Sequence, residues 1–521
     1  MYSIVTTAIV QGINSVPVSV EADVSDGMPV FEMVGFLAAE VKESKERVRT
    51  ALRNMGYVLP AKRITINFTP ANIRKTGSGF DLPIAMAILS AMGVVSVEAL
   101  NGVFIIGEIC LNGQIRSVNG LLPMLLEAKK EGMKSCIIPF DNAEEAALVK
   151  QLPVYAVKDL KEAIGVLNKT EETVQATYRR EDKQWSGRGP QNVKNEAEII
   201  EKVPDFAEIH GQHMLKRACE TAVSGMHNLL MIGPPGAGKT MVASRIPSIL
   251  PGLEEEEQME LSKIYSVCGL FGNRKALMER RPFRNPHHTI SPQGLVGGGY
   301  MPKPGEISLA HKGVLFLDEL PEFKKETLEV LRQPMEEKVA RLVRLNGTFE
   351  YPSDFMLVAA MNPCKCGYYP DMQKCRCSAA AIERYLERIS QPLLDRIDIC
   401  TAVTQIPFEE LTMDVKEESS KQIRERVAMV HERMRFRYRE EAFTFNSQIP
   451  ASQIGMYCKL SMKQEDYMKK VYQELNLTAR SYHKILKVAR TLADMDGVEQ
   501  IADKHLKEAI CYRSVDKKLW K

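Results

Sequence analysis

The sequence predicts an α/β protein with more than one domain. Short apolar, β-rich segments alternate with helix-compatible segments over residues 1–166, and the alternation returns from residue 229 onwards. Between these regions, residues 169–198 are polar and charged with almost no aliphatic side chains, which is typical of a linker. A chain of 521 residues is also too long for one hydrophobic core. We therefore expect an N-terminal α/β domain over residues 1–168 and a second α/β domain from residue 199.

The composition is that of a globular protein without a membrane span. Hydrophobic residues make up 45% of the chain, charged residues 26%, and the formal net charge is only +3, so any nucleic-acid-binding surface must be local. The longest uncharged run, residues 82–97, contains Pro83 and is shorter than the roughly 20 apolar residues that cross a bilayer. The first residues lack the basic and apolar parts of a secretory signal. We expect a buried helix in the uncharged run, a cytoplasmic location and no membrane partner.

The N-terminal domain combines β-rich and helical segments. These lie at residues 64–68, 103–109 and 122–131. Gly107–Gly120 and Ile137–Phe140 resemble the proteolytic domain of Lon-type proteases, which implies a fold like that of ribosomal protein S5 domain 2. Such a protease needs a serine nucleophile and a lysine base. Residues 121–124 after the Asn-Gly turn contain no lysine, and Ser78 is one position out of register. We expect a proteolytically inactive domain that serves assembly or substrate docking.

A phosphate-binding loop follows the first apolar run of the second domain. Leu229–Ile232 precedes a glycine-rich turn, and a helix-compatible stretch follows at Met241–Leu250. In this setting backbone N–H groups can close around phosphate oxygens, the Lys239 ammonium can reach the β- and γ-phosphates, and the Thr240 hydroxyl can ligate Mg²⁺. The predicted nucleotide-binding residues are Gly233, Pro234, Pro235, Gly236, Ala237, Gly238, Lys239 and Thr240. The pattern indicates binding of ATP or GTP.

Two further apolar strands end in polar side chains that would meet this loop. Residues 314–317 are followed by Asp318 and Glu319, as expected for the neighbouring strand of a parallel sheet. Asp318 would hold Mg²⁺ through water, and Glu319 would polarise the attacking water. Residues 355–361 are followed by Asn362, an amide placed where it could sense the γ-phosphate. These positions predict nucleotide hydrolysis.

The order of these motifs resembles that of the AAA+ ATPases. Downstream motifs of the same family are matched by Leu393–Asp398 and Leu477–Ser481. The segments Arg281–Ser291 and Leu295–Gly299 resemble the magnesium-chelatase small-subunit branch. With its Lon-like front domain, the whole chain is similar to the ComM/YifB family.

This resemblance implies a ring-forming ATPase with two functional arginines. It implies an AAA+ domain over residues 199–412 and a helical lid over residues 413–521. Arg396 corresponds to the arginine finger offered to the ATP of the adjacent subunit, and Arg480 to the second sensor on the lid over its own ATP. A finger supplied in trans requires a self-assembled ring, usually a hexamer in this family. Ile209–Gln212 resembles the segment that packs against adenine, which favours ATP over GTP.

A cysteine cluster comes directly after Asn362, within an insertion over residues 364–377. Its members are Cys364, Cys366, Cys375 and Cys377. Four thiols paired across a Gly/Pro turn could close a tetrahedral structural Zn²⁺ site. Because the Cys-x-Cys spacing is tighter than the common knuckle, a redox pair or unligated thiols remain alternatives. The other seven cysteines are expected to be reduced core residues. His287 and His288 form a weaker metal candidate, because adjacent side chains diverge on a helix or strand.

An alternating pattern around Asn346-Gly347 predicts a β-hairpin between the second and third strands of the core. Related AAA+ rings place such a hairpin in the central pore, where cations can follow a phosphodiester backbone. The candidates for DNA contact are Lys338, Arg341 and Arg344. An ordinary solvated hairpin is the alternative interpretation.

Two classes of function agree with these features. The ComM/YifB resemblance implies a motor that binds single-stranded or branched DNA and moves branch points during recombination of transforming DNA, with recombination proteins as partners. The chelatase resemblance instead implies a magnesium-chelatase-like or chaperone-type ATPase that remodels protein or metallocofactor complexes. The Lon-like domain and the cysteine cluster favour the DNA motor, because they match the ComM/YifB arrangement and not the plain chelatase subunit. The expected cofactors are ATP, Mg²⁺ and a structural Zn²⁺.

Overall fold

The computed structural model describes residues 1–169, 204–271, 278, 280–299, 302–344, 347–405 and 417–519. The chain divides into two compact units, Met1–Glu196 with Gln258–Met278 and Ala197–Glu257 with Glu279–Lys521. Each unit contains helices packed on a β-sheet, so the predicted α/β fold class is confirmed. Apart from Lys169, the predicted linker lies outside the described residues. None of the helices in the described ranges combines the length and the apolar character needed to cross a membrane.

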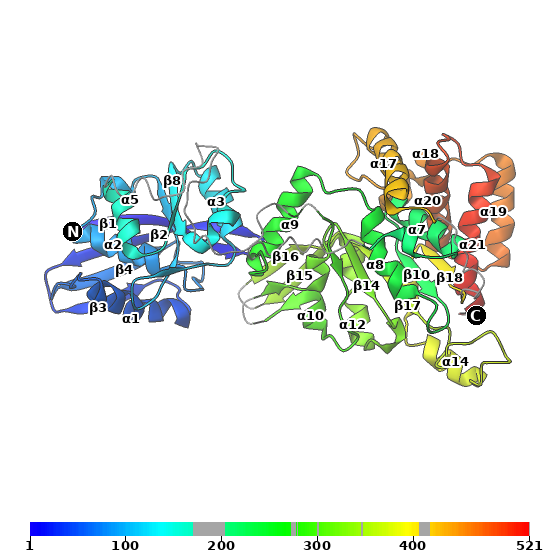
Figure 1. Cartoon of the computed structure of the whole chain (residues 1–521), viewed down its shortest axis with the longest axis horizontal. Helices are drawn as coiled ribbons and strands as arrows, with labels where there is room; N and C mark the ends of the chain where they lie inside the picture. Colours follow the sequence, from blue (N-terminus) through cyan, green and yellow to red (C-terminus); the bar gives the residue numbers. More distant parts are fainter. Residues whose placement is uncertain are drawn as a thin grey trace. The chain divides into compact units, whose positions relative to one another are not determined.

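The first unit is built on a seven-stranded sheet (Figure 1). In spatial order its strands are β3 (Val30–Val34), β4 (Arg63–Thr69), β2 (Asn14–Ser25), β1 (Tyr2–Gln11), β5 (Val103–Ile105), β8 (Ser135–Pro139) and β9 (Val154–Val157). The pairs β1–β2 and β2–β4 are antiparallel, and the other pairs are parallel. A short hairpin of β6 (Glu108–Ile109) and β7 (Ile115–Arg116) follows β5.

Helices complete the core of this unit. They are α1 (Ala39–Asn54), α2 (Asp81–Ala91), α3 (Leu121–Lys130), α4 (Ala143–Ala146), α5 (Leu160–Asn168) and the C-terminal part of α9 (Glu255–Val267). Every residue of α2 is buried: its neutral side chains can pack against the sheet and the other helices on all faces, and the carboxylate of Asp81 is paired with Arg47 at 2.8 Å. The uncharged run of the sequence therefore begins as a core helix, as predicted.

The second unit contains a five-stranded parallel sheet. In spatial order its strands are β11 (Phe283–Arg284), β14 (Val314–Leu317), β17 (Met356–Met361), β10 (Leu229–Ile232) and β18 (Ile399–Ala402). The strands β10, β14 and β17 are the three predicted from apolar runs, and each is buried along its whole length. Because the strands are parallel, the residues that follow them meet at one edge of the sheet.

Short helices and two hairpins surround this sheet. The helices are α7 (His213–Gly225), α8 (Lys239–Ile249), α10 (Pro292–Val296), α11 (Glu306–Leu309), α12 (Lys325–Glu329), α13 (Arg332–Glu337), α14 (Ala379–Leu386) and α15 (Gln391–Leu394). The hairpins pair β12 (Gly297–Gly298) with β13 (Lys303–Pro304) and β15 (Val339–Arg344) with β16 (Gly347–Pro352). The second is the predicted hairpin, although Asn346 itself lies outside the described residues.

The C-terminal part of the second unit is helical, as predicted, and is drawn orange to red in Figure 1. Its helices are α17 (Ser420–Arg437), α18 (Ile454–Tyr457), α19 (Met462–Glu474), α20 (Ala479–Met495) and α21 (Asp503–Leu519). The helix α17 packs against α7 and α8, and α20 packs against α7 and α21. The helical part therefore lies directly on α7 and α8, the helices before and after β10.

Candidate functional site

Three neighbouring strands bring the predicted nucleotide-site residues together. Because β14, β17 and β10 are adjacent, the P-loop after β10, the Asp318–Glu319 pair after β14 and Asn362 after β17 share one edge of the sheet. The loop begins tightly at Gly233, where a Cβ atom would lie 2.3 Å from the carbonyl oxygen of Val403. Only glycine fits this approach between the loop and the end of β18.

Lys239 is the first residue of α8, and its ammonium is held inside the loop. Its Nζ donates to the carbonyl oxygens of Gly233 at 2.8 Å and Pro234 at 2.9 Å, and to Asn362 Oδ1 at 3.0 Å. Burial lowers the pKa of Lys239, while the two carboxylates after β14 oppose that shift. Lys239 and Asn362, the residue predicted to sense the γ-phosphate, are therefore in direct contact.

Thr240 and Asp318 form the second half of the site. The Thr240 hydroxyl donates to Asp318 Oδ2 at 2.6 Å, and Asp318 Oδ1 accepts from the backbone N–H of Glu319 at 2.9 Å. A hydroxyl and a carboxylate oxygen this close together supply the hard oxygen ligands that Mg²⁺ takes. P-loop NTPases use the same pair of groups to hold the metal. The residues present therefore fit a nucleotide–Mg²⁺ complex.

Glu319 stands in the turn after β14 with an exposed carboxylate. Its φ of +51° lies in the left-handed region, which costs a non-glycine residue about 1–3 kcal/mol. Its Oε2 lies 3.7 Å from Nδ1 of His288, which follows β11. The His288 ring in turn lies 4.1 Å from the ring of His287, centroid to centroid. The strained backbone thus directs this carboxylate away from the buried strand, towards the surface beside the loop.

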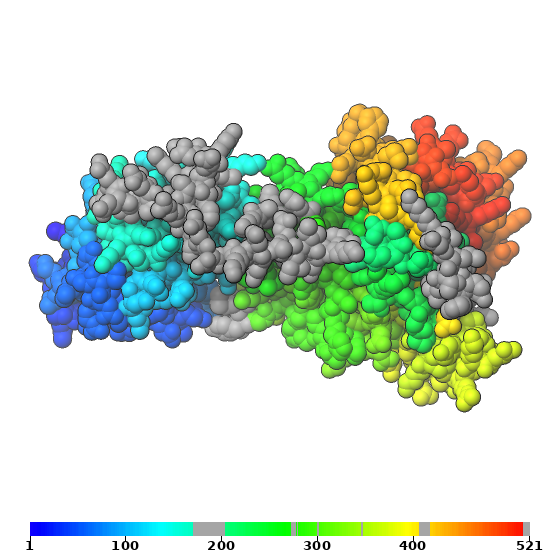
Figure 2. Space-filling model, viewed as in Figure 1, coloured from blue at the N-terminus to red at the C-terminus, as the bar shows by residue number. Residues whose placement is uncertain are grey.

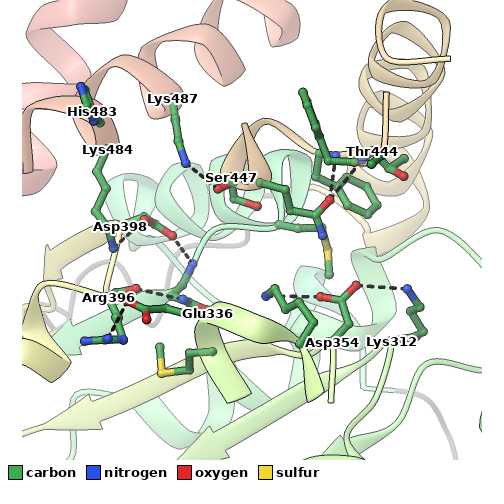
Figure 3. Close-up of a pocket in the computed structure, with 18 of the residues that line it drawn as sticks. Lys312, Glu336, Asp354, Arg396, Asp398, Thr444, Ser447, His483, Lys484 and Lys487 are labelled. Atoms are coloured by element: carbon green, nitrogen blue, oxygen red, sulfur yellow. Dashed lines mark hydrogen bonds and ion pairs between the residues drawn. The ribbon is translucent and has the colours of Figure 1, made fainter. Parts of the chain in front are cut away.

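Arg396 and Arg480 line one charged cavity of about 770 Å³. Figure 3 shows Arg396 in the wall of this cavity. Arg396 is fixed there by Glu336, whose Oε1 lies 2.5 Å from Nη2. Burial lowers the pKa of Arg396, and the positive charge of Arg480 acts in the same direction. No residue of the loop 233–240 lines the cavity. The structure therefore groups Arg480 with Arg396, whereas the family resemblance predicted a position over the ATP of its own subunit.

Ion pairs neutralise two carboxylates in the wall of this cavity, those of Asp398 and Asp354 (Figure 3). Although burial acts the other way, the Lys484 ammonium at 2.9 Å helps to hold the pKa of Asp398 well below its usual range. Asp354 lies 3.0 Å from Lys312 and 3.3 Å from Lys338. Burial again opposes the shift, but these cations lower the pKa of Asp354 to about 2. Both carboxylates are therefore charged at neutral pH and already paired.

The four clustered cysteines lie in the loop between β17 and α14, and their sulfur atoms all lie within 4.8 Å of one another. Cys364 Sγ is 3.3 Å from Cys366 Sγ and 3.7 Å from Cys375 Sγ. Four thiolates with Zn–S distances of about 2.3 Å would place their sulfurs roughly 3.8 Å apart. Within the described ranges no other group of three or more metal-ligating side chains gathers in this way. The cluster fits a tetrahedral S₄ zinc site.

The remaining cysteines form no disulfide among the described residues. The prediction of buried core thiols is right for Cys136, Cys219, Cys400 and Cys458. Burial raises the pKa of Cys219 to about 12, which keeps it unreactive. Cys110 and Cys268 are half-buried and Cys511 is exposed, so for these three the prediction is wrong. Cys110 directly follows β6, Cys268 directly follows α9, and Cys511 lies on an exposed position of α21 (Asp503–Leu519), and residue type alone does not reveal such positions.

Of the three residues predicted to contact DNA, Arg341 and Arg344 lie in β15 and Lys338 directly precedes it. Two of the three are engaged in ion pairs. Arg341 Nη1 lies 2.6 Å from Glu337 and its Nε lies 2.7 Å from Glu350. Lys338 is the partner of Asp354 described above. Arg344 Nη1 donates to the carbonyl of the preceding residue at 3.0 Å, and no carboxylate of the described residues pairs with it. Arg344 is therefore the hairpin cation most available to a ligand.

The N-terminal unit gives Ser78 a carboxylate partner. The Ser78 hydroxyl donates to Glu108, which begins β6. Lys75, three residues earlier, is fully buried, and its Nζ donates to the backbone carbonyls of Ile73, at 2.9 Å, and of Pro70. Neither contact supplies the serine–lysine pair of a Lon-type protease. The inactivity of this domain stays a prediction.

Two residues that hold the site carry no motif signal in the sequence. Glu336 supplies the ion pair of Arg396, and Gly367 packs against Pro235 of the P-loop. Both contacts join residues far apart in the chain, so no local pattern marks them. A glycine directly after the metal-ligand candidate Cys366 is the one available hint.

Comparison with known proteins agrees with this geometry. The family model described as "Magnesium chelatase, subunit ChlI" matches residues 205–411, and models of the subunit ChlI and of its C-terminal part match residues 20–142 and 417–513. Competence protein ComM of Haemophilus influenzae is 41% identical over 515 residues, which cover 98% of this chain and 97% of that protein.

Two other relatives complete the comparison. YifB of Escherichia coli, described as uncharacterized, is 39% identical over 99% of this chain and 98% of its own length. Lon protease 2 of Bacillus subtilis is 36% identical over 126 residues, or 24% of this chain and 22% of that protein. The chain therefore belongs to the ComM/YifB family, the AAA+ ATPases that join a Lon-like N-terminal region to a ChlI-type ATPase core and a helical C-terminal region.

Proposed function

We propose that this protein is a ring-forming, ATP-driven motor that binds single-stranded or branched DNA and moves branch points during recombination of incoming DNA. The ATPase part rests on the contacts Lys239–Asn362 and Thr240–Asp318, which join the residues of a phosphoryl-transfer site at one sheet edge. The DNA part is supported by a relative named as a competence protein, which matches 98% of the chain. Recombination proteins are the partners that this role requires.

Each of the residues at the sheet edge would have its own role in ATP hydrolysis. Bound ATP with Mg²⁺ supplies the scissile phosphoanhydride and the cation that neutralises its charge. Lys239 would exchange its two carbonyl acceptors for β- and γ-phosphate oxygens. Thr240 and Asp318 would hold the metal, directly and through water. Glu319 would polarise the attacking water, and Asn362 would orient it against the γ-phosphate.

The site is complete only when two copies of the chain meet. Arg396 and Arg480 line one cavity that no P-loop residue of the same chain shares, which favours action on the nucleotide of an adjacent subunit. A guanidinium is suited to this task because it stays charged and presents a planar fork to phosphate oxygens. A closed ring of heterologous contacts gives every subunit one such neighbour, and we propose a hexamer.

We also propose that the protein binds a structural Zn²⁺. The residues that would hold it are Cys364, Cys366, Cys375 and Cys377, whose spacing fits four zinc thiolates. Four protein ligands leave no open coordination position, so the role of such a metal is structural. The backbone N–H of Tyr369 donates to Cys364 Sγ at 3.4 Å, as an outer-shell group around a thiolate does.

Arg344 is the DNA-contacting residue that the hairpin best supports, because it has no carboxylate partner among the described residues. Lys338 and Arg341 would contribute only after exchanging their carboxylate partners for phosphates. The Lon-like domain would serve assembly or substrate docking and would not cleave peptides. The motor would thus bind DNA through its hairpin and couple DNA binding to ATP hydrolysis.

A second candidate function is remodelling of protein or metallocofactor complexes. It is favoured by the family models, all three of which are named after a magnesium-chelatase subunit. The two candidates differ in the ligand that should stimulate ATP hydrolysis, because a motor hydrolyses ATP faster when the molecule it moves along is bound.

The test is the ATPase rate at increasing concentrations of single-stranded or forked DNA. Wild-type protein should be stimulated, and Arg344→Ala should need more DNA for half-maximal stimulation and show a shallower salt dependence, because fewer counterions are released per complex. Arg439→Ala, at an arginine that is 64% exposed in the helical part, is the matched control and should behave like wild type. Failure of wild-type protein to bind any DNA would favour the remodelling function.

A further inference from the structure

The cysteine loop touches the phosphate-binding loop directly. Gly367, between Cys366 and the rest of the loop, has a φ of +87°, and a Cβ atom at this position would lie 2.4 Å from Cδ of Pro235. Real Cβ atoms do not approach other heavy atoms this closely, and a proline ring cannot swing away. The backbone at Gly367 therefore packs directly against the P-loop, and this contact is possible because Gly367 has no side chain.

The same loop is tied to the nucleotide site at its other end. Asn362, which accepts from Lys239 Nζ at 3.0 Å, lies two residues before Cys364. After the cysteines, α14 leads to Arg388, whose Nη1 donates to Glu322 at 3.0 Å. Glu322 lies in the turn Leu320–Glu322 that follows Glu319. The cysteine segment thus connects the P-loop lysine to the turn that directly follows Glu319, the residue proposed to activate water.

The loop that carries the four sulfurs has no regular secondary structure. Between β17 and α14 the chain has no helix or strand, and its backbone bonds are short-range turns such as Gly367 N–H to Cys364 O at 3.0 Å and Cys375 N–H to Asp371 O at 2.8 Å. The segment around α14 projects as a yellow lobe on the surface of the second unit (Figure 2). When a metal binds such a loop, the free energy of binding stabilises the ordered conformation of the loop.

We propose that the cysteine centre is a metal-dependent clamp on the nucleotide site, so that Zn²⁺ and ATP bind cooperatively. With the metal bound, the loop presses Gly367 onto Pro235 and keeps Asn362 on Lys239. Without it, both contacts loosen and ATP affinity falls. The inference rests on the proposed ATP site and goes beyond it, because it assigns a regulatory ligand to a centre that takes no part in the chemistry.

Reciprocity makes this coupling measurable from both sides. If Zn²⁺ raises ATP affinity by some factor, ATP must raise Zn²⁺ affinity by the same factor. Couplings between sites in proteins are on the order of 5- to 150-fold. Dissociation constants for a non-hydrolysable ATP analogue are measured on zinc-loaded and zinc-free full-length protein. Zinc affinity is then measured by competition with a chromogenic chelator, with and without the analogue.

Zinc-loaded protein should contain about one Zn²⁺ per chain, as a single tetrahedral four-cysteine site requires, and removing it should weaken analogue binding about tenfold or more. Readdition of Zn²⁺ should restore the affinity. Cys366→Ser should lose both the metal and the tight binding, whereas Cys110→Ser, outside the cluster, should lose neither. Equal analogue affinity with and without zinc, or purified protein that takes up no zinc, would overturn the proposal.

Gly367→Ala separates the contact from the metal site. It removes no ligand, so zinc content should stay at one per chain, yet analogue affinity should fall to that of zinc-free protein and the coupling should vanish. Gly132→Ala is the matched control, because its φ is +72° and a Cβ there meets nothing within 4 Å. Unchanged analogue affinity in Gly367→Ala protein would refute the clamp, even if zinc-free protein fails to fold.

These readouts contain no DNA. Absence of DNA binding would therefore overturn the motor function and leave the coupling as measured. Failure of zinc-loaded wild-type protein to bind the analogue would overturn the ATP site itself.

Discussion

Replacing Arg480 by alanine in one subunit should disable the ATP site of its neighbour and leave its own P-loop intact. This follows from the cavity that Arg480 shares with Arg396 and with no residue of the loop 233–240. Arginines that stabilise a transferring phosphoryl group contribute roughly 10³-fold or more to the rate in related NTPases. Protein made only of Arg480→Ala subunits should therefore hydrolyse ATP about a thousandfold more slowly and still bind it.

Mixing Arg480→Ala subunits with Lys239→Ala subunits tests the placement quantitatively. Each complete site needs Lys239 from one subunit and Arg480 from the next. In a random equal mixture, about half of the subunits carry the lysine and about half of their neighbours carry the arginine, so about one quarter of the sites are complete. The ATPase rate, followed by phosphate release across mixing ratios, should rise to roughly a quarter of the wild-type rate, with its maximum at equal amounts.

Two control mixtures should show no recovery. Lys239 and Glu319 serve the same site from the same subunit, so Lys239→Ala mixed with Glu319→Gln leaves every site incomplete. Arg396 and Arg480 come from one cavity, so their two alanine variants cannot complement each other either. Recovery in the Arg396/Arg480 mixture, together with none in the Lys239/Arg480 mixture, would place Arg480 over the nucleotide of its own subunit and refute the reasoning.

Three further outcomes are expected. Glu319→Gln should bind ATP as tightly as wild type but hydrolyse it far more slowly, since only the group that polarises water is lost; normal turnover in a phosphate-release assay would exclude that role. Asp354→Asn should lower the free energy of unfolding at pH 7 by about 2 kcal/mol, because the folded-state pKa of about 2 lies below the unfolded value. That stabilisation is present above about pH 4 and lost as the pH falls towards 2. Between these pH values, the free energy of unfolding measured by denaturant titration should therefore fall less steeply in the variant than in the wild type. An equal slope in the two proteins would contradict the pairing. Peptidase assays should detect no cleavage with or without ATP; cleavage that disappears in Ser78→Ala would show an active protease.

Much of the fold follows from local sequence. The runs that became β10, β14 and β17 are continuous apolar segments, a pattern that buried parallel strands produce; β14 and β17 end at polar residues and β10 ends at a glycine-rich loop. After its first residue, Asp81, helix α2 carries no charged side chain, and it is buried on all sides. The two-residue strand β11 and the grouping of Gln258–Met278 with the first unit depend on contacts between distant segments, and no local pattern predicts them.

The predicted nucleotide site likewise combines residues that local sequence indicates with positions that depend on tertiary packing. The grouping of Lys239, Thr240, Asp318 and Asn362 at one sheet edge was predictable, because each comes after a strand of the same parallel sheet. The position of Arg480 depends on how α20 packs over the core, which periodicity does not specify.

Side-chain pairing explains the other gap between sequence and structure. Arg341 and Arg344 look alike in the hairpin sequence, yet only the structure shows that Glu337 and Glu350 neutralise Arg341. Ion pairs between strands and across turns therefore decide which cations of a basic hairpin remain available to DNA.

The most direct measurement of the motor function is branch migration of a synthetic four-way DNA junction, followed on a gel as the conversion of junction to duplex products. Wild-type protein with ATP and Mg²⁺ should convert the junction. Glu319→Gln protein should bind the same junction without converting it, because it retains the nucleotide site and lacks hydrolysis. Conversion at equal rates by both proteins, or no binding of junction and single-stranded DNA by the wild type, would contradict an ATP-driven motor on DNA.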